Sequence, residues 1–133
     1  MIGIKKGLWH CRPIPTLLAI ALSTCLNAAS STPLLRVASV QMEVSTEIEK
    51  NLERIQKGIR EAKEHNARVI LFPETALSGF DRETVENLDW SHLDRAMAAI
   101  ATAADEHDLY VIYGSATRSG EKKPYNSAVV VGL

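Results

Sequence analysis

Cysteine is scarce in this sequence, and that scarcity limits its chemistry. Two cysteines occur among 133 residues, and both, Cys11 and Cys25, lie within the first thirty positions. Residues 30–133 can therefore form no internal disulfide and contain no thiol nucleophile. Any chemistry performed by this part of the chain has to rest on other side chains.

A surplus of positive charge is also absent. The formal net charge is −1, and residues 30–133 hold 12 basic and 16 acidic residues. Residues 30–133 therefore lack the excess of basic residues that is typical of a nucleic-acid-binding domain. We therefore expect no nucleic-acid partner and favour a protein that acts on small molecules.

No apolar run reaches the roughly 20 residues that a membrane-spanning helix needs. The longest, Ile14 to Leu26, is interrupted by polar residues, follows Lys5, Lys6 and Arg12, and precedes a group of small residues. A positive segment, a short apolar segment and small residues in this order are typical of a secretory signal peptide. We predict that residues 1–29 are a signal peptide, that the protein is exported to the periplasm or secreted, and that it has no stable membrane span.

Two details of this leader stay open. Cleavage after Ala28, Ala29 or Ser31 fits the pattern equally well. The stretch Leu22-Ser23-Thr24-Cys25 resembles a bacterial lipoprotein cleavage box, although Thr24 fits poorly where that box prefers Gly, Ala or Ser. Lipid anchoring at Cys25 is therefore the weaker alternative to an ordinary apolar position.

The rest of the chain has the size and composition of one globular domain. The sequence is 46% apolar and 23% charged, and 133 residues are too few for two domains of ordinary size. Residues 30–133 are accordingly expected to form a single domain.

The hydrophobic pattern predicts strands and helices that alternate. Residues 34–42 alternate between two faces and predict an interior strand, and residues 69–72 predict a strand that is buried on both faces. Between them, apolar residues recur at three- and four-residue steps, which predicts a helix that starts at Ser45 or Thr46 and ends near residue 66. Thr46 and Glu49 have the spacing of a capping box.

The second half continues this pattern and closes with a hairpin. Residues 81–90 are polar and show no period, and Ser91 is expected to cap a second helix. Residues 109–117 and 125–133 predict two strands joined by the turn at 118–124. The order β-α-β-α-β-β indicates a layered α/β fold.

One acidic residue follows the strand at 69–72 directly. Pro73 lacks an N–H and ends the pairing of that strand, so Glu74 is expected at its carboxyl end. Ligands of open α/β sheets bind at this end, where loops converge on a crevice. Glu74 is therefore our candidate for a catalytic general base, and the alternative is a solvated carboxylate in a turn.

Two other polar groups are expected to be solvated helix ends. His65 lies at a helix carboxyl end, where the helix dipole favours it. Asp105 to Asp108 are consecutive, and consecutive residues of a helix point in different directions, which does not suit a metal site. We expect neither a metal nor a cofactor.

Several short motifs together resemble the nitrilase, or carbon-nitrogen hydrolase, superfamily. They occur in the order found in that family and cover nearly all of residues 35–133. The matching segments are Val37-Ala38-Ser39-Val40-Gln41-Met42, Asn51-Leu52, Ile70-Leu71-Phe72-Pro73-Glu74, Leu77-Ser78-Gly79-Phe80, Gly114-Ser115 and Tyr125-Asn126-Ser127-Ala128.

The resemblance implies a fold and a reaction. The fold would be a four-layer α-β-β-α sandwich, incomplete in this chain, and the substrate a small amide or nitrile. The family uses a Glu-Lys-Cys triad, in which a Cys thiolate attacks the carbon, the Glu acts as base and later as acid, and the Lys stabilises the tetrahedral intermediate. Glu74 matches the family's Glu, and a homo-oligomer is possible.

Two members of that triad have no match here. The family's Lys and Cys would both fall after residue 133. Lys122 and Lys123 lie before the last strand, in a turn where solvation explains them, and Cys25 belongs to the leader. We therefore predict an exported carbon-nitrogen hydrolase of which this chain is the N-terminal part, inactive by itself. The alternative is a non-catalytic binding or interaction module on the same fold.

Overall fold

The computed structural model describes residues 33–120 and 123–132. The predicted signal peptide, its cleavage sites and lipidation at Cys25 lie outside these residues. The elements, in chain order, are β1 (Val37–Ser39), α2 (Ile48–Glu64), β2 (Val69–Leu71), α3 (Arg82–Glu86), α4 (Trp90–His107), β3 (Tyr110–Thr117) and β4 (Tyr125–Val131). Apart from the short helix α3, their order is the predicted one.

The four strands form one sheet in the order β1-β2-β3-β4. β1, β2 and β3 run parallel, and β4 returns antiparallel to β3 as the predicted hairpin. Among the described strands β1 pairs with β2 alone, so the prediction of an interior strand at 34–42 is wrong for this part of the chain. β1 pairs with β2 at three positions, from Val37↔Val69 to Ser39↔Leu71, and the Val40 N–H then bonds the Leu71 oxygen.

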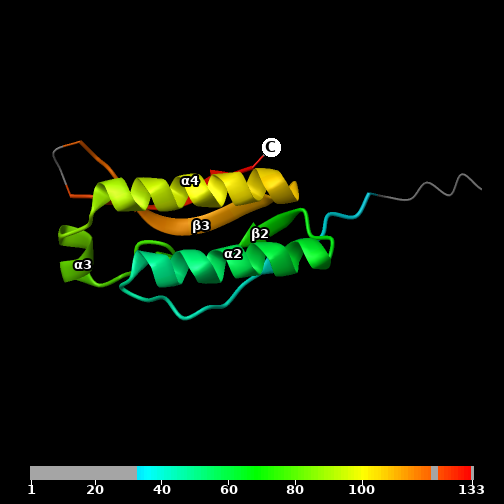
Figure 1. Cartoon of the computed structure of the whole chain (residues 1–133), viewed down its shortest axis with the longest axis horizontal. Helices are drawn as coiled ribbons and strands as arrows, with labels where there is room; N and C mark the ends of the chain where they lie inside the picture. Colours follow the sequence, from blue (N-terminus) through cyan, green and yellow to red (C-terminus); the bar gives the residue numbers. More distant parts are fainter. Residues whose placement is uncertain (1–32, 121–122, 133) are drawn as a thin grey trace, which may run out of the picture. The chain divides into compact units, whose positions relative to one another are not determined.

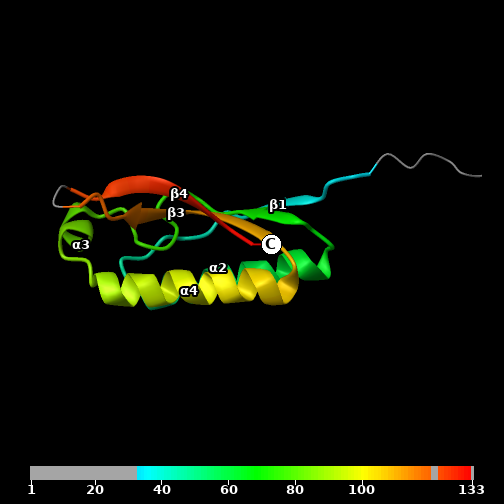
Figure 2. The same cartoon turned by 90° about the horizontal axis from the view of Figure 1, so that it is seen from above.

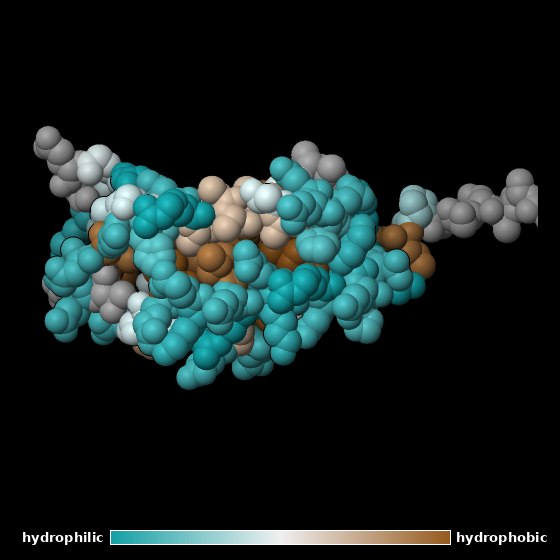
Figure 3. Space-filling model, in the orientation of Figure 1, coloured by the Kyte–Doolittle hydropathy of each residue, from teal (hydrophilic) through white to brown (hydrophobic). Residues whose placement is uncertain are grey.

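Helices α2 and α4 lie side by side on one face of this sheet (Figures 1 and 2). Their apolar sides and the facing strand positions form the core, which includes Ile55, Ile59, Ile70, Leu93, Ile100, Val111 and Tyr113. The outward sides of the two helices are mainly hydrophilic, with an apolar strip between them (Figure 3). The sheet is therefore anchored to a helical layer on one side.

The opposite face of the sheet, here called the open face, has no helical layer in the described residues. The pairing register places Val37, Leu71, Tyr110 and Val130 on it. Val37 and Val130 are 54% and 60% exposed, whereas Ile70 and Val111 on the helical face are fully buried. One sheet and one helical layer are half of the four layers implied by the resemblance.

Both helix starts differ from the predicted caps. Glu47 precedes α2 and makes no side-chain cap, and Ser45 instead accepts a hydrogen bond from the Glu47 N–H. Asp89, not Ser91, caps α4, accepting from the N–H groups of Ser91 and His92. These bonds and the Ser91 hydroxyl stabilise the ionised form and lower the pKa of Asp89. A capping signal in sequence fits several adjacent registers, and packing selects among them.

Within the described part of the chain, no helix is both long and apolar enough to cross a bilayer.

Candidate active site

Glu74 lies where the sequence placed it, just past the end of β2. The Phe72 N–H still bonds the Ile112 oxygen of β3, and Pro73 then ends this pairing. Residues 73–80 form a loop beside β3 in place of a longer strand. The Glu74 side chain is exposed in the described chain, and it is therefore accessible to a ligand.

Gly114 of β3 allows this loop to approach the sheet. Its N–H bonds the Pro73 oxygen at 3.1 Å, and its own oxygen accepts the Leu77 N–H at 3.1 Å. A Cβ at Gly114 would lie 2.2 Å from the Thr75 nitrogen and 2.7 Å from the Glu74 Cα. The backbone that carries Glu74 thus rests directly on a position that tolerates no side chain.

Two buried polar side chains hold the far end of the same loop. Asn51 of α2 donates to the Leu77 oxygen at 3.1 Å and to the Ser45 oxygen at 2.7 Å, and it accepts from the Ser45 N–H. Ser78 accepts from the Ala116 N–H at 2.9 Å. These bonds join the loop to α2 and to β3, so the position of Glu74 is fixed from both sides.

The Glu74 carboxylate also meets a side chain from the other end of the chain. Asn126 Nδ2 of β4 donates to Glu74 Oε1 at 2.5 Å. Asn126 reaches it because Asn126 pairs with Ala116 and so shares the open face with Gly114 and Ala128. Sequence reasoning used Asn126 as part of a motif but assigned it no role. Pairing the two predicted hairpin strands in register would have placed it near the loop.

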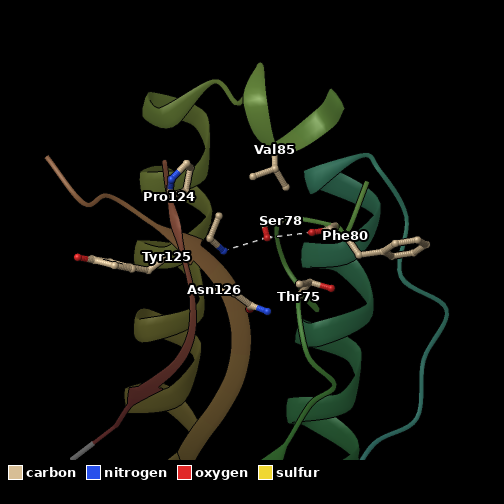
Figure 4. Close-up of a pocket in the computed structure, with 9 residues that line it drawn as sticks. Thr75, Ser78, Phe80, Val85, Pro124, Tyr125 and Asn126 are labelled. Carbon is tan, nitrogen blue, oxygen red and sulfur yellow. Dashed lines mark hydrogen bonds between the residues drawn. The ribbon is translucent and has the colours of Figure 1, made fainter. Parts of the chain in front are cut away.

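Two small hollows flank this pair. One, of about 160 Å³, lies between Glu74, Ile112, Gly114 and Ala128 on the open face. The other, also of about 160 Å³, is lined by Thr75, Ser78, Gly79, Phe80, Val85, Ala116, Pro124, Tyr125 and Asn126. Figure 4 shows this second hollow, where Asn126 projects from β4 towards the loop and Ser78 bonds at its wall. Among the described side chains that line it, none is a carboxylate, an ammonium or a guanidinium, which suits an uncharged ligand.

The other polar residues considered from the sequence, where the structure describes them, have no contact with Glu74 among its hydrogen bonds and ion pairs. Lys122 is outside the described residues, and Lys123 is exposed in the hairpin loop, with its backbone oxygen bonded by Ser119. His65 follows the last turn of α2, and Asp108 pairs with Arg68 on the surface. No three His, Cys, Asp or Glu side chains of the described residues gather into a metal-binding group.

The exposed carboxylate of Glu74 lies just past a parallel strand, at the end of the sheet where ligands of α/β proteins bind. Comparison with known proteins gives the family of the chain. The family model described as "Carbon-nitrogen hydrolase" matches residues 36–133. The chain therefore belongs to the carbon-nitrogen hydrolase family, as the motifs predicted.

Individual relatives agree with this assignment. A nitrilase from Pyrococcus abyssi (strain GE5 / Orsay) is 31% identical over 104 residues, which are 74% of this chain and 39% of the nitrilase. An amidase structure from Nesterenkonia sp. aligns with a TM-score of 0.66 at 18% identity, over 72% of this chain and 37% of the amidase. A glutamine-dependent NAD+ synthetase from Acinetobacter baumannii aligns with a TM-score of 0.66 at 22% identity, over 74% of this chain and 19% of the synthetase.

Further structures of the Nesterenkonia amidase concern its chemistry. One is described as a complex with acrylamide, and another as the product of Michael addition of acrylamide at the active-site cysteine. The structural likeness confirms the α/β fold over about three quarters of the chain. The chain spans 39% of the nitrilase and 37% of the first amidase.

Proposed function

We propose that this chain is the N-terminal part of an exported carbon-nitrogen hydrolase of amidase or nitrilase type, and that Glu74 is its general base. The observation that carries the proposal is the placement of Glu74. Its carboxylate lies at the end of a parallel strand, exposed to ligand, beside two hollows, and hydrogen-bonded by a neutral amide. Family membership supplies the reaction class.

In the proposed reaction Glu74 moves protons. Its carboxylate takes the proton of a cysteine thiol, and the thiolate attacks the amide carbon to form a tetrahedral intermediate. Glu74 returns the proton to the leaving nitrogen, which departs as ammonia and leaves a thioester. Glu74 then deprotonates water, which releases the carboxylic acid and restores the thiol. An exposed carboxylate with one free oxygen, Oε2, is suited to each of these transfers.

The reacting cysteine, and the lysine of the Glu-Lys-Cys triad, would belong to a longer polypeptide of which this chain is a part. Residues 30–133 contain no cysteine, and the Nesterenkonia amidase has a cysteine in its active site. This chain matches 37–39% of the amidase and nitrilase chains, which leaves room for both residues. Residues 1–133 alone are therefore expected to be inactive.

The same longer polypeptide would complete the sandwich. Val37, Leu71, Tyr110 and Val130 expose an apolar open face, and burial of such a surface is the main stabilising contribution to folding. A second sheet on this face would give the four-layer α-β-β-α arrangement. Two such polypeptides could pair as a homo-oligomer without involving the open face.

Hydrolysis of simple amides tests the proposal. Ammonia release from a panel of small neutral amides and nitriles is measured for residues 1–133 and for the polypeptide that continues through a downstream Lys and Cys. We expect activity in the longer polypeptide alone. Activity of the short chain would contradict the requirement for a separate thiol, and inactivity of the longer polypeptide on the whole panel would favour a binding module.

Export is tested on the mature N-terminus. Mass spectrometry of protein recovered from the periplasm or medium should show a chain that starts after Ala28, Ala29 or Ser31. An acylated Cys25 at the N-terminus would instead support the lipid-anchored form. An intact Met1 would contradict export by this leader.

A further inference from the structure

The carboxylate of Glu74 receives a single hydrogen bond from the residues that the structure describes. Its donor is Asn126 Nδ2, which lies 2.5 Å from Glu74 Oε1 and 52 positions away in the sequence. Two exposed side chains from different elements rarely stay in contact without a reason, because ordering each of them costs conformational entropy. A functional role for the contact would explain why both side chains are ordered.

The strand that carries Asn126 is firmly held. β4 pairs with β3 at seven consecutive positions, from Val111↔Val131 to Thr117↔Tyr125. The hydroxyls of Thr117 and Ser127 add a 2.7 Å bond between the same strands. The loop contains Thr75 in a left-handed conformation, with φ of 54°, which is unfavourable for a β-branched residue. Asn126 therefore projects from a firmly paired strand and can orient the exposed carboxylate of Glu74.

The chemistry of the donor suits a general base. An amide N–H stabilises an ionised carboxylate and fixes its orientation without adding a charge. Asn126 bonds Oε1, and no hydrogen bond from the described residues reaches the second oxygen, Oε2, which can accept a proton. A lysine or arginine at this position would form an ion pair and compete with the substrate for the carboxylate.

We propose that Asn126 is a positioning residue of the hydrolase, which holds the Glu74 carboxylate in one orientation towards the reacting atoms. This inference rests on the proposed function of Glu74. It adds a residue from the last strand of this chain to the catalytic apparatus. It also explains why the β3–β4 hairpin and the loop at 73–80 are needed together.

A purely structural role for the contact is the competing explanation. At metal sites, loss of a partner that orients a ligand typically lowers affinity or activity about 10–100-fold. We expect the same range for a partner that orients a catalytic carboxylate. A structural contact would change stability and leave turnover per folded molecule unchanged. The two explanations therefore differ in kcat, not in the amount of folded protein.

The test uses three variants of the amide-hydrolysing polypeptide. Asn126→Ala removes the donor, and Asn126→Asp keeps the shape of the side chain but replaces the donor with a second carboxylate. Asn87→Ala is the matched control, since Asn87 is also exposed and bonds a backbone oxygen, that of Glu83. The readouts are kcat and KM per folded molecule, and the side-chain amide NMR signal of Asn126 in wild type and in Glu74→Gln.

We expect Asn126→Ala to lower kcat about 10–100-fold with KM within about 2-fold, in keeping with loss of an orienting partner. Asn126→Asp should lower kcat further, because like charges repel, and Asn87→Ala should change it less than about 2-fold. The Asn126 amide signal should shift in Glu74→Gln. Unchanged kcat in both Asn126 variants would overturn the proposal.

Failure of the proposed function gives a different result. Wild-type polypeptide that hydrolyses no amide or nitrile overturns the function of Glu74 and the catalytic role of Asn126 together. An Asn126 amide signal that still responds to Glu74→Gln would then show that the contact exists as a structural feature. Active wild type with a fully active Asn126→Ala overturns the role of Asn126 alone.

Discussion

At the scale of single residues, Gly114 sets how closely the Glu74 loop approaches the sheet. Gly114→Ala places a Cβ 2.2 Å from the Thr75 nitrogen, and the neighbouring atoms are backbone, which cannot rotate away. We expect a loss of about 1–3 kcal/mol in the free energy of unfolding, as for other overpacked sites. Urea unfolding followed by circular dichroism measures it.

Gly120→Ala is the matched control for this change. Gly120 has a φ of 70°, and a Cβ added to it would have no neighbouring atom within 4 Å. Alanine at this position therefore meets backbone strain of about 1 kcal/mol and no clash. Equal losses at the two positions would contradict the close-approach explanation. A larger loss at Gly114, joined to a fall in activity of the longer polypeptide, would support it.

Tyr113 offers a second residue-level prediction. Its hydroxyl is buried without a hydrogen-bond partner among the described residues, and its side chain is 1% exposed. Tyr113→Phe removes an unsatisfied polar group and is expected to raise the free energy of unfolding by roughly 1 kcal/mol. Tyr125→Phe, at a residue that is 61% exposed, should leave it unchanged. Destabilisation by Tyr113→Phe would show that the hydroxyl has a partner.

The same burial predicts a pH dependence. Burial raises the pKa of Tyr113 to about 12 from its ordinary value of 10.0. The pKa of Tyr113 is higher in the folded state than in the unfolded state. The contribution of the neutral Tyr113 side chain to the free energy of unfolding is therefore complete below pH 10 and is lost as the pH rises from 10 towards 12. Thermal melts across this range should fall less steeply in Tyr113→Phe than in wild type. Parallel profiles would contradict the raised pKa.

At the scale of elements, the connection between α2 and the loop at residues 73–80 depends on Asn51. Its side chain makes three hydrogen bonds, to Ser45 N, Ser45 O and Leu77 O, and it is fully buried. Asn51→Ala leaves buried backbone groups unpaired, at a cost of about 1–3 kcal/mol for each group that finds no water. Chemical unfolding should detect the loss, while Asn87→Ala, at an exposed position, should stay within about 0.5 kcal/mol of wild type.

The elements also show what sequence patterns can predict. Hydrophobic periodicity predicts the order of strands and helices, because each longer helix buries one apolar face and each strand an alternating or continuous set of apolar residues. The short helix α3 did not, since Asp81 to Trp90 is polar and five helical residues bury too little to leave a period. The predicted N-cap of α4 is Ser91, and the observed N-cap is Asp89. Both residue types cap helices, and only the hydrogen bonds that form distinguish them.

Local sequence patterns predict only part of the candidate site. Glu74 was found because a buried strand and a proline precede it directly in the chain. Asn126 was not, since its contact with Glu74 depends on the hairpin register, on the absence of a Cβ at Gly114 and on the path of the loop. Contacts between residues 52 positions apart are set by packing, which no local pattern records.

At the scale of the whole molecule, the open face is the surface that the proposed second sheet would cover. Val130→Lys in residues 1–133 should cost less than about 0.5 kcal/mol, because the side chain is 60% exposed there. In the longer polypeptide the same charge would be buried between two sheets, and we expect a loss of several kcal/mol. Comparing the two unfolding midpoints checks the four-layer proposal. Equal small losses would contradict it.

The central claim is that Glu74 is the base of a carbon-nitrogen hydrolase. The most direct measurement is the rate of ammonia release from a small amide by the longer polypeptide, compared between Glu74→Gln and Glu53→Gln. Glu53 is an exposed residue of α2 and serves as the matched control. Loss of a general base commonly costs about 10²–10⁴-fold in rate, so Glu74→Gln should lose at least about 100-fold and Glu53→Gln less than about 2-fold. A folded Glu74→Gln variant with wild-type turnover would contradict the account.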